Sequence, residues 1–124
     1  MTAARASVLV VDDNPENRDM LSRRLARRGY TVAVAEDGDQ ALKMSEAEHF
    51  DLVLLDIMMP GISGLDVLKI LRNRYSVADL PVIMATAKDQ SSEIVEALQI
   101  GANDYVTKPL DFPVVLARVE TQLA

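Results

Sequence analysis

Four places in the sequence pair a short apolar run with a side chain suited to phosphoryl-transfer chemistry. The side chains are the adjacent acids Asp12 and Asp13, the single acid Asp56, the hydroxyl of Thr86 and the ammonium of Lys108. Carboxylates brought close together repel one another unless a cation neutralises them, and Mg²⁺ prefers oxygen ligands of this kind. Lysine and threonine can donate hydrogen bonds to a phosphoryl oxygen. Because positioning and charge neutralisation supply most of the catalysis in phosphoryl transfer, this set of residues points to that reaction class.

Each of these residues also has an ordinary structural explanation. Asp12 and Asp13 precede an Asn-Pro pair and could cap a helix, and Asp56 precedes a Pro-Gly turn that it could help to form. Thr86 could be present for its β-branched shape, and Lys108 could be a solvated loop lysine. Each signal is weak alone. The hypothesis of a site therefore depends on all four places carrying the required chemistry at once.

The elements that would position these residues alternate between two periodicities. Short apolar runs predict strands at residues 8–11, 31–35, 50–55, 81–85 and 104–107. Continuous runs of this kind are typical of strands buried on both faces. Segments with helical spacing follow every run, so the sequence predicts an α/β fold: a doubly wound parallel sheet with helices on both faces.

The strand order cannot be derived from these patterns, but the flavodoxin-like order 2-1-3-4-5 is the expected one for five units. In such open sheets, sites form outside the carboxyl ends of the strands, where the residues named above would lie. Capping signals place helix starts at Asn14-Pro15, Asp37-Gly38 and Pro113, and a third helix over residues 64–74. The fourth helix is expected to be capped by Ser91 or Ser92.

The composition excludes several classes of function. The 124 residues are 49% hydrophobic and 26% charged, which predicts one globular domain. The absence of cysteine excludes disulfides and thiolate metal sites and fits a reducing cytoplasm. The net charge of -6 argues against direct binding of nucleic acid. No apolar run is long enough for a membrane span or a signal peptide, so we expect no membrane partner and a cytoplasmic location.

Other familiar constellations are missing or weak. The sequence contains neither a Gly-x-Gly-x-x-Gly motif nor a Walker A loop, so nucleotide binding lacks its usual phosphate cradle. His49 is the only histidine, and it precedes a strand, at the wrong end for a Ser/His/Asp triad. Five arginines in the first helix are either a solvated face or a surface for a protein partner: Arg18, Arg23, Arg24, Arg27 and Arg28.

The segments VLVVDDN, LVLLDIMMPGISG, VIMATA and GANDYVTKPL resemble the receiver domains of two-component response regulators, the CheY-like superfamily. The resemblance covers essentially the full chain, and the DxxMPG turn makes it specific. It implies one receiver (response regulatory) domain over residues 1–124, which could also be the N-terminal part of a longer protein.

The resemblance implies roles for the acidic residues. Asp56 would be the phosphoacceptor, receiving its phosphoryl group from a sensor histidine kinase or a histidine phosphotransfer protein. Mg²⁺ would be bound by Asp13, by Asp56 and by the carbonyl of Met58, with Asp12 acting mainly through a coordinated water.

The resemblance also implies a switch that involves Thr86 and Tyr105. After phosphorylation the Thr86 hydroxyl would move to the phosphoryl oxygens and the Tyr105 ring would turn inward. This would alter the face made by the fourth helix, fifth strand and fifth helix, and so signal to a downstream effector domain or protein. Lys108 and the backbone N–H of Ala87 would contact the phosphoryl group, and the Lys108-Pro109 bond is expected to be cis.

The chain is expected to be a switch that catalyses its own phosphorylation and dephosphorylation, not a dedicated enzyme; any effector enzyme would lie outside it. In the family, side chains at the positions of Met58 and Lys88 tune the access of water. Because Met58 cannot orient a water, we expect a long-lived phosphorylated state.

A weak or phosphorylation-dependent dimer is compatible with the sequence. Asp104 and Arg118 match the charged pairs of receivers in the winged-helix group. Ile94 and Val114 stand where that group has a basic and an acidic residue, which argues against its salt-bridged dimer.

Three alternatives fit the sequence less well than an active receiver does. An aspartyl-phosphate phosphatase of the haloacid-dehalogenase type needs a second acid where Met58 stands. A flavodoxin relative needs a hydroxyl-rich phosphate loop and more aromatic residues than this chain has. A receiver that no longer takes phosphate is disfavoured by the intact set of acids.

Overall fold

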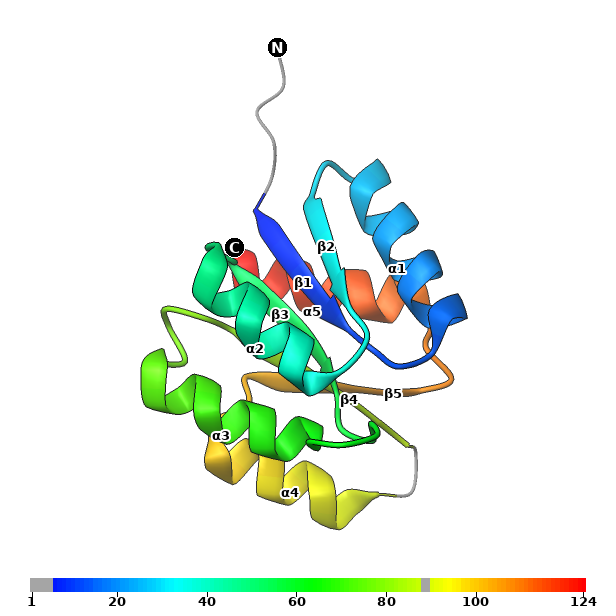
Figure 1. Ribbon diagram of the computed structural model, residues 1–124. Helices are drawn as coiled ribbons and strands as arrows, with labels where there is room; N and C mark the ends of the chain where they lie inside the picture. Colours follow the sequence, from blue (N-terminus) through cyan, green and yellow to red (C-terminus); the bar gives the residue numbers. More distant parts are fainter. Residues whose placement is uncertain (1–5, 88–89) are drawn as a thin grey trace.

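The computed structural model describes residues 6–87 and 90–124, and these residues form five strands and five helices that alternate along the chain (Figure 1). The strands are β1 (Ser7–Val11), β2 (Thr31–Ala35), β3 (Leu52–Asp56), β4 (Val82–Ala87) and β5 (Asp104–Lys108). The helices are α1 (Pro15–Arg27), α2 (Gly38–Ala47), α3 (Gly64–Arg74), α4 (Ser91–Ile100) and α5 (Phe112–Leu123). All neighbouring strands pair in parallel, in the order β2-β1-β3-β4-β5, which confirms the predicted fold and strand order.

Helices cover both faces of the sheet, and each face has its own apolar core. On one face, Leu21 and Leu25 of α1 pack with Val115 and Val119 of α5 against the sheet. On the other face, buried residues of α2, α3 and α4 pack together with alternate strand residues. Every residue of the central strand β3 is buried. The continuous apolar runs in the sequence therefore have a simple cause, since a strand covered on both faces needs apolar side chains in both directions.

Two strands continue beyond their predicted ends. β4 extends to Ala87 and β5 to Lys108, because Thr86 pairs with Thr107 and Ala87 pairs with Lys108. β3 begins later than predicted, at Leu52, and includes Asp56 as its last residue. These extensions make Asp56 and Lys108 part of the sheet, so their backbones are held by strand pairing.

Helix starts agree with the capping signals at α1 and α2, whereas α5 begins at Phe112, one residue before the predicted Pro113. The Asn14 side chain accepts hydrogen bonds from the amides of Glu16 and Asn17 at the start of α1, as its sequence position predicts. The prediction that Ser91 or Ser92 caps α4 is wrong. Gln90 occupies the cap position, without a side-chain hydrogen bond.

One glycine allows α3 to begin directly against the end of β3. A Cβ atom at Gly64 would collide with the carbonyl oxygen of Asp56. The Gly64 amide also donates a 2.9 Å hydrogen bond to the carbonyl of Ile57, which closes the β3–α3 connection. Gly64 therefore lets the loop fold tightly beside Asp56.

None of the helices in the described ranges combines the length and apolarity that crossing a bilayer requires.

Candidate functional site

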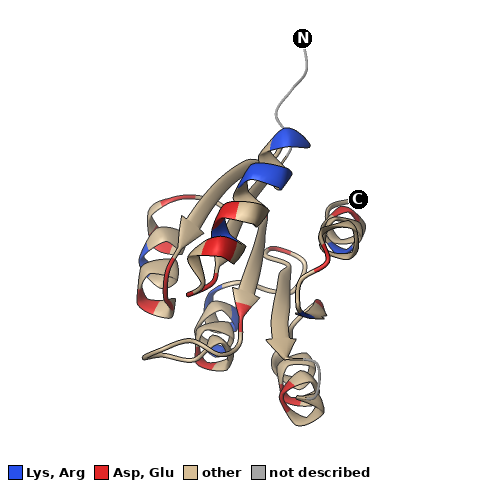
Figure 2. Ribbon diagram, turned by 90° about the vertical axis from the view of Figure 1, so that its right-hand side faces the viewer, with Lys and Arg blue, Asp and Glu red and all other residues tan. Residues whose placement is uncertain are grey.

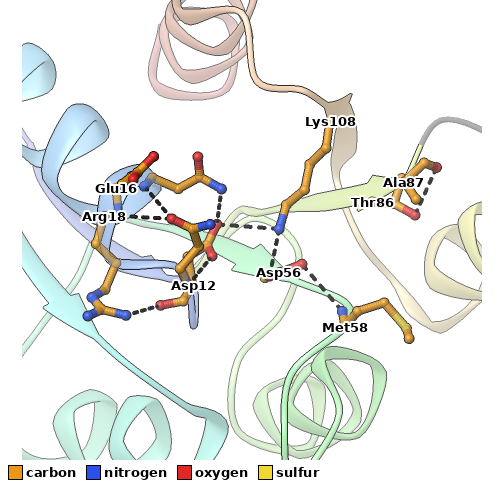
Figure 3. Close-up of polar contacts among 10 residues, drawn as sticks. Asp12, Glu16, Arg18, Asp56, Met58, Thr86, Ala87 and Lys108 are labelled. Atoms are coloured by element: carbon orange, nitrogen blue, oxygen red, sulfur yellow. Dashed lines mark hydrogen bonds and ion pairs between the residues drawn. The ribbon is translucent and has the colours of Figure 1, made fainter.

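The carboxyl ends of four strands bring the predicted site residues to one edge of the sheet (Figure 3). Asp12 directly follows β1, and Asp56 is the last residue of β3. Thr86 is the penultimate residue of β4, and Lys108 is the last residue of β5. These residues are far apart in the sequence. They lie close together because all strands of a parallel sheet end at the same edge.

Asp12 is buried, and its carboxylate is held by several groups. Only 2% of the residue is exposed. Its Oδ1 accepts a 2.8 Å hydrogen bond from the Asn14 amide, and its Oδ2 accepts a 3.3 Å bond from the Asn17 side chain. The Nζ of Lys108 lies 3.6 Å from the same Oδ2. Asp12 thus joins the start of α1 to the charged centre of the site.

Asp56 is equally buried and makes the closest ion pair of the site. Its Oδ2 accepts a 2.8 Å hydrogen bond from Lys108 Nζ, and its Oδ1 accepts a 3.3 Å bond from the Met58 amide. Burial raises the pKa of Asp56 from 3.8 to about 6, and the bond to Lys108 opposes only part of that rise. Asp56 is therefore mostly ionised at neutral pH, although burying its charge is unfavourable.

Lys108 remains charged in this setting. Burial lowers the pKa of its ammonium group, but the hydrogen bond to Asp56 and the charges of Asp56, Asp12 and Asp13 outweigh burial, so its pKa is raised. A permanently charged ammonium beside Asp56 can neutralise an incoming phosphoryl oxygen.

The acids also fit a divalent cation. Asp12, Asp13 and Asp56 can each offer one carboxylate oxygen, and these oxygens all lie within 4.8 Å of one another. Asp13 is exposed, so the cluster is open to solvent on its side. Oxygen-only donors with room for water suit Mg²⁺, whereas zinc or copper sites usually use imidazole or thiolate. The Met58 amide bonded to Asp56 places residue 58 beside the same cluster.

Within the described residues, neither Thr86 nor Tyr105, the two predicted switch residues, is hydrogen-bonded to Asp56. Thr86 is 1% exposed, and its hydroxyl donates a 3.4 Å hydrogen bond to the carbonyl of Ala87 (Figure 3). Tyr105 lies in β5, and 36% of the residue is exposed. The Lys108-Pro109 peptide bond is cis, as expected. Lys88 lies outside the described residues.

Sequence reasoning missed the role of Arg18. It grouped Arg18 with the exposed arginines of α1, but only 16% of this side chain is exposed. Its Nη1 donates a 2.8 Å hydrogen bond to the carbonyl oxygen of Asp12. A signal was available, because Arg18, Leu21 and Leu25 follow the i, i+3, i+7 spacing of a buried helix face.

The remaining arginines of the first helix form a separate exposed group at its end. Lys and Arg residues gather at one end of α1, and acidic residues lie nearer its start (Figure 2). Arg23 pairs with Asp19 at 3.0 Å, and the guanidinium of Arg24 lies 5.6 Å from the centre of the Phe112 ring. These arginines are exposed, so they form a solvated face of the helix.

His49 lies before β3, as expected, and pairs with Asp51 at 3.0 Å. The side chain of His49 is 79% exposed. Since β3 carries Asp56 at its other end, His49 cannot join the site chemistry.

The chain matches the model of the response regulator receiver domain over residues 8–120. Its structure is similar to the receiver domain of the TMAO respiratory system response regulator TorR, at 31% identity and a TM-score of 0.89, over 96% of this chain and 97% of that one. It is also similar to the chemotaxis response regulator CheY4 of Vibrio cholerae, at 30% identity and a TM-score of 0.89, over 97% of this chain and 100% of that one. A two-component system response regulator/GGDEF domain protein matches at 32% identity and a TM-score of 0.91, over 95% of this chain but 49% of that longer one.

Proposed function

This chain belongs to the response regulator receiver domain family, and on that premise we propose that it is a phosphorylation-dependent signalling switch with Asp56 as its phosphoryl acceptor. Receiver domains serve two-component systems, bind Mg²⁺ at an acidic cluster and work with kinases and effector domains. The observation that carries the assignment to Asp56 is its position between Lys108 and two further acids. Asp12 is equally buried in the same cluster, but its distance to Lys108 Nζ is 3.6 Å, against 2.8 Å for Asp56.

The proposed reaction uses the carboxylate of Asp56 as a nucleophile. One of its oxygens forms a bond to phosphorus while the P–N bond of the donor's phosphohistidine breaks, and the imidazole leaves. Lys108 neutralises charge on a phosphoryl oxygen throughout, because its ammonium already faces Asp56. The donor would be a sensor histidine kinase or a histidine phosphotransfer protein.

The metal ligands we propose are Asp13, Asp56 and the carbonyl of Met58. Bound Mg²⁺ would supply positive charge to the phosphoryl oxygens. Asp12 would act mainly through a coordinated water, while its carboxylate accepts hydrogen bonds from Asn14 and Asn17.

The signal would leave the site through Thr86 and Tyr105. The Thr86 hydroxyl is held only by a long 3.4 Å bond to Ala87, so a phosphoryl oxygen offers it a better partner. The space it vacates would accept the Tyr105 ring, which now lies partly exposed. The backbone N–H of Ala87 would add a further phosphate contact. The resulting change would reach an effector domain or protein through α4, β5 and α5.

Two charged residues of that face, Asp104 and Arg118, pair within the chain. Arg118 Nε lies 3.4 Å from an oxygen of Asp104, so each has a partner without a second copy. Val114 is exposed and Ile94 is half-buried. These contacts argue against a dimer held by intermolecular salt bridges. They are compatible with a weak or phosphorylation-dependent dimer.

The proposal is tested by adding acetyl phosphate and Mg²⁺ and measuring the intact mass of wild type and Asp56→Asn. We expect wild type alone to gain one phosphoryl group. A gain in both proteins, or in neither, would overturn the assignment.

A further inference from the structure

The three acids of the cluster differ in how their side chains are held. The carboxylate of Asp12 accepts bonds from Asn14 and Asn17, and that of Asp56 accepts bonds from Lys108 and Met58. Asp13 is exposed, and within residues 6–87 and 90–124 no group donates a hydrogen bond to its carboxylate. The place of Asp13 is therefore set by its backbone alone.

That backbone is held by Arg18. Arg18 Nη1 donates a 2.8 Å hydrogen bond to the carbonyl oxygen of Asp12, which belongs to the peptide that joins Asp12 to Asp13 (Figure 3). Its Nη2 lies 3.5 Å from an oxygen of Glu36, which follows β2. The guanidinium thus links the peptide group between Asp12 and Asp13 to the neighbouring β2–α2 connection.

Helix stability does not explain this arginine. Arg18 lies near the start of α1, where the helix dipole disfavours a positive charge. Its side chain is only 16% exposed, and burying a guanidinium costs free energy unless its donors are bonded. The basic residues in the last turn, Arg24 and Arg27, have the favourable position instead.

We propose that Arg18 is a positioning residue for the metal site: by holding the Asp12 carbonyl, it orients Asp13 toward the cation. The inference rests on the proposed function, because it assumes that the acids bind Mg²⁺. The planar fork of arginine suits the task, since two of its nitrogens reach two partners at once.

The test is Mg²⁺ binding measured by calorimetry on wild type, Arg18→Gln and Arg18→Lys. Loss of an outer partner of a metal ligand typically weakens metal binding about 10-fold or more, so we expect that change in Arg18→Gln. Arg18→Lys keeps one donor and should recover part of the affinity. With acetyl phosphate, the Mg²⁺ concentration for half-maximal modification should rise in Arg18→Gln, while the rate at saturating Mg²⁺ stays near wild type.

Two controls separate positioning from general destabilisation. Arg23→Gln removes an exposed arginine of the same helix that pairs with Asp19, and should leave Mg²⁺ affinity unchanged. Leu25→Val loosens the packing of α1 from a fully buried position and should lower the unfolding temperature without changing Mg²⁺ affinity.

The outcomes are distinguishable. If wild type binds no Mg²⁺, the proposed function fails and this inference falls with it. If wild type binds Mg²⁺ and folded Arg18→Gln and Arg18→Lys bind it equally well, the inference alone is overturned. Should Arg18→Gln not fold, Glu36→Gln, which weakens the second bond of Arg18, must reduce the affinity for the inference to stand.

Discussion

The Nζ of Lys108 lies 2.8 Å from Oδ2 of Asp56, although the two residues are 52 positions apart and β4 lies between their strands. The lysine reaches across a neighbouring strand to meet the acid. Both ends of this bond are fixed by strand pairing, because Lys108 pairs with Ala87 and Asp56 pairs with Ala85. The sheet therefore holds the charge pair in place without help from a loop.

Asp56→Asn should stabilise the protein at neutral pH when Mg²⁺ is absent. Burial raises the pKa of Asp56 to about 6, so the folded state binds this proton more tightly than the unfolded state. Stability due to this group is present below its ordinary pKa of 3.8 and is lost as pH rises to about 6. We expect a gain on the order of 1 kcal/mol for Asp56→Asn at pH near 7.5, since solvent screens part of the roughly 1.4 kcal/mol per pKa unit.

Urea unfolding of wild type and variant at several pH values checks this prediction, and the gain should vanish in acid. Asp51→Asn is the matched contrast. The backbone hydrogen bond from Ser7 lowers the pKa of Asp51, so its charged form stabilises the fold above pH 3.8. Asp51→Asn should therefore lose stability at neutral pH. Equal effects of the two variants at neutral pH would contradict this account.

Lys108→Met should bind Mg²⁺ more tightly than wild type yet accept a phosphoryl group more slowly. The substitution frees Oδ2 of Asp56 and removes the cation that neutralises Asp12 and Asp56, so the cluster attracts an added cation more strongly. The incoming phosphoryl oxygens lose their ammonium partner. Calorimetry and the rate of acetyl phosphate modification measure the two effects, and a fall in both would show that Lys108 organises the acids instead of competing for them.

Much of the fold follows from local pattern, but the strand ends do not. Residues 8–11 and 52–55 read directly as buried strands because both faces need apolar residues. Near the ends of β4 and β5, Thr86, Thr107 and Lys108 are polar and carry no such signal. These ends are strand because they pair with one another, and this long-range pairing is absent from either segment taken alone.

The sequence predicts which residues lie together at the site, but it does not predict the individual contacts between their atoms. Asp12, Asp56, Thr86 and Lys108 share an edge because parallel strands end together. Which oxygen each donor uses depends on loop geometry. The contact of Arg18 with the Asp12 carbonyl also depends on this geometry. The helical spacing of Arg18 indicated a buried helix face, but it could not predict which atom the guanidinium contacts.

Phosphorylation should reduce the accessibility of Tyr105, and Thr86→Ala should prevent this change. The Thr86 hydroxyl has to leave its 3.4 Å bond with Ala87 before the ring can occupy the space. Chemical labelling of tyrosine followed by mass spectrometry measures ring exposure in the two states. Tyr75, which is half-buried and donates a hydrogen bond to the Ser45 carbonyl, serves as the internal control. Equal labelling of Tyr105 before and after phosphorylation would remove it from the switch.

The phosphorylated state should be long-lived, because the side chain of Met58, two residues after Asp56, cannot direct a water. Met58 is 63% exposed, and its thioether is a weak acceptor. We expect Met58→Gln, whose amide can both donate to and accept from water, to shorten the phosphoryl lifetime several-fold. Met58→Leu keeps an apolar side chain of similar size and should leave the lifetime unchanged. Loss of the phosphoryl mass is followed over time at saturating Mg²⁺. A wild-type half-life of seconds would show that water reaches the phosphoryl group without help from residue 58.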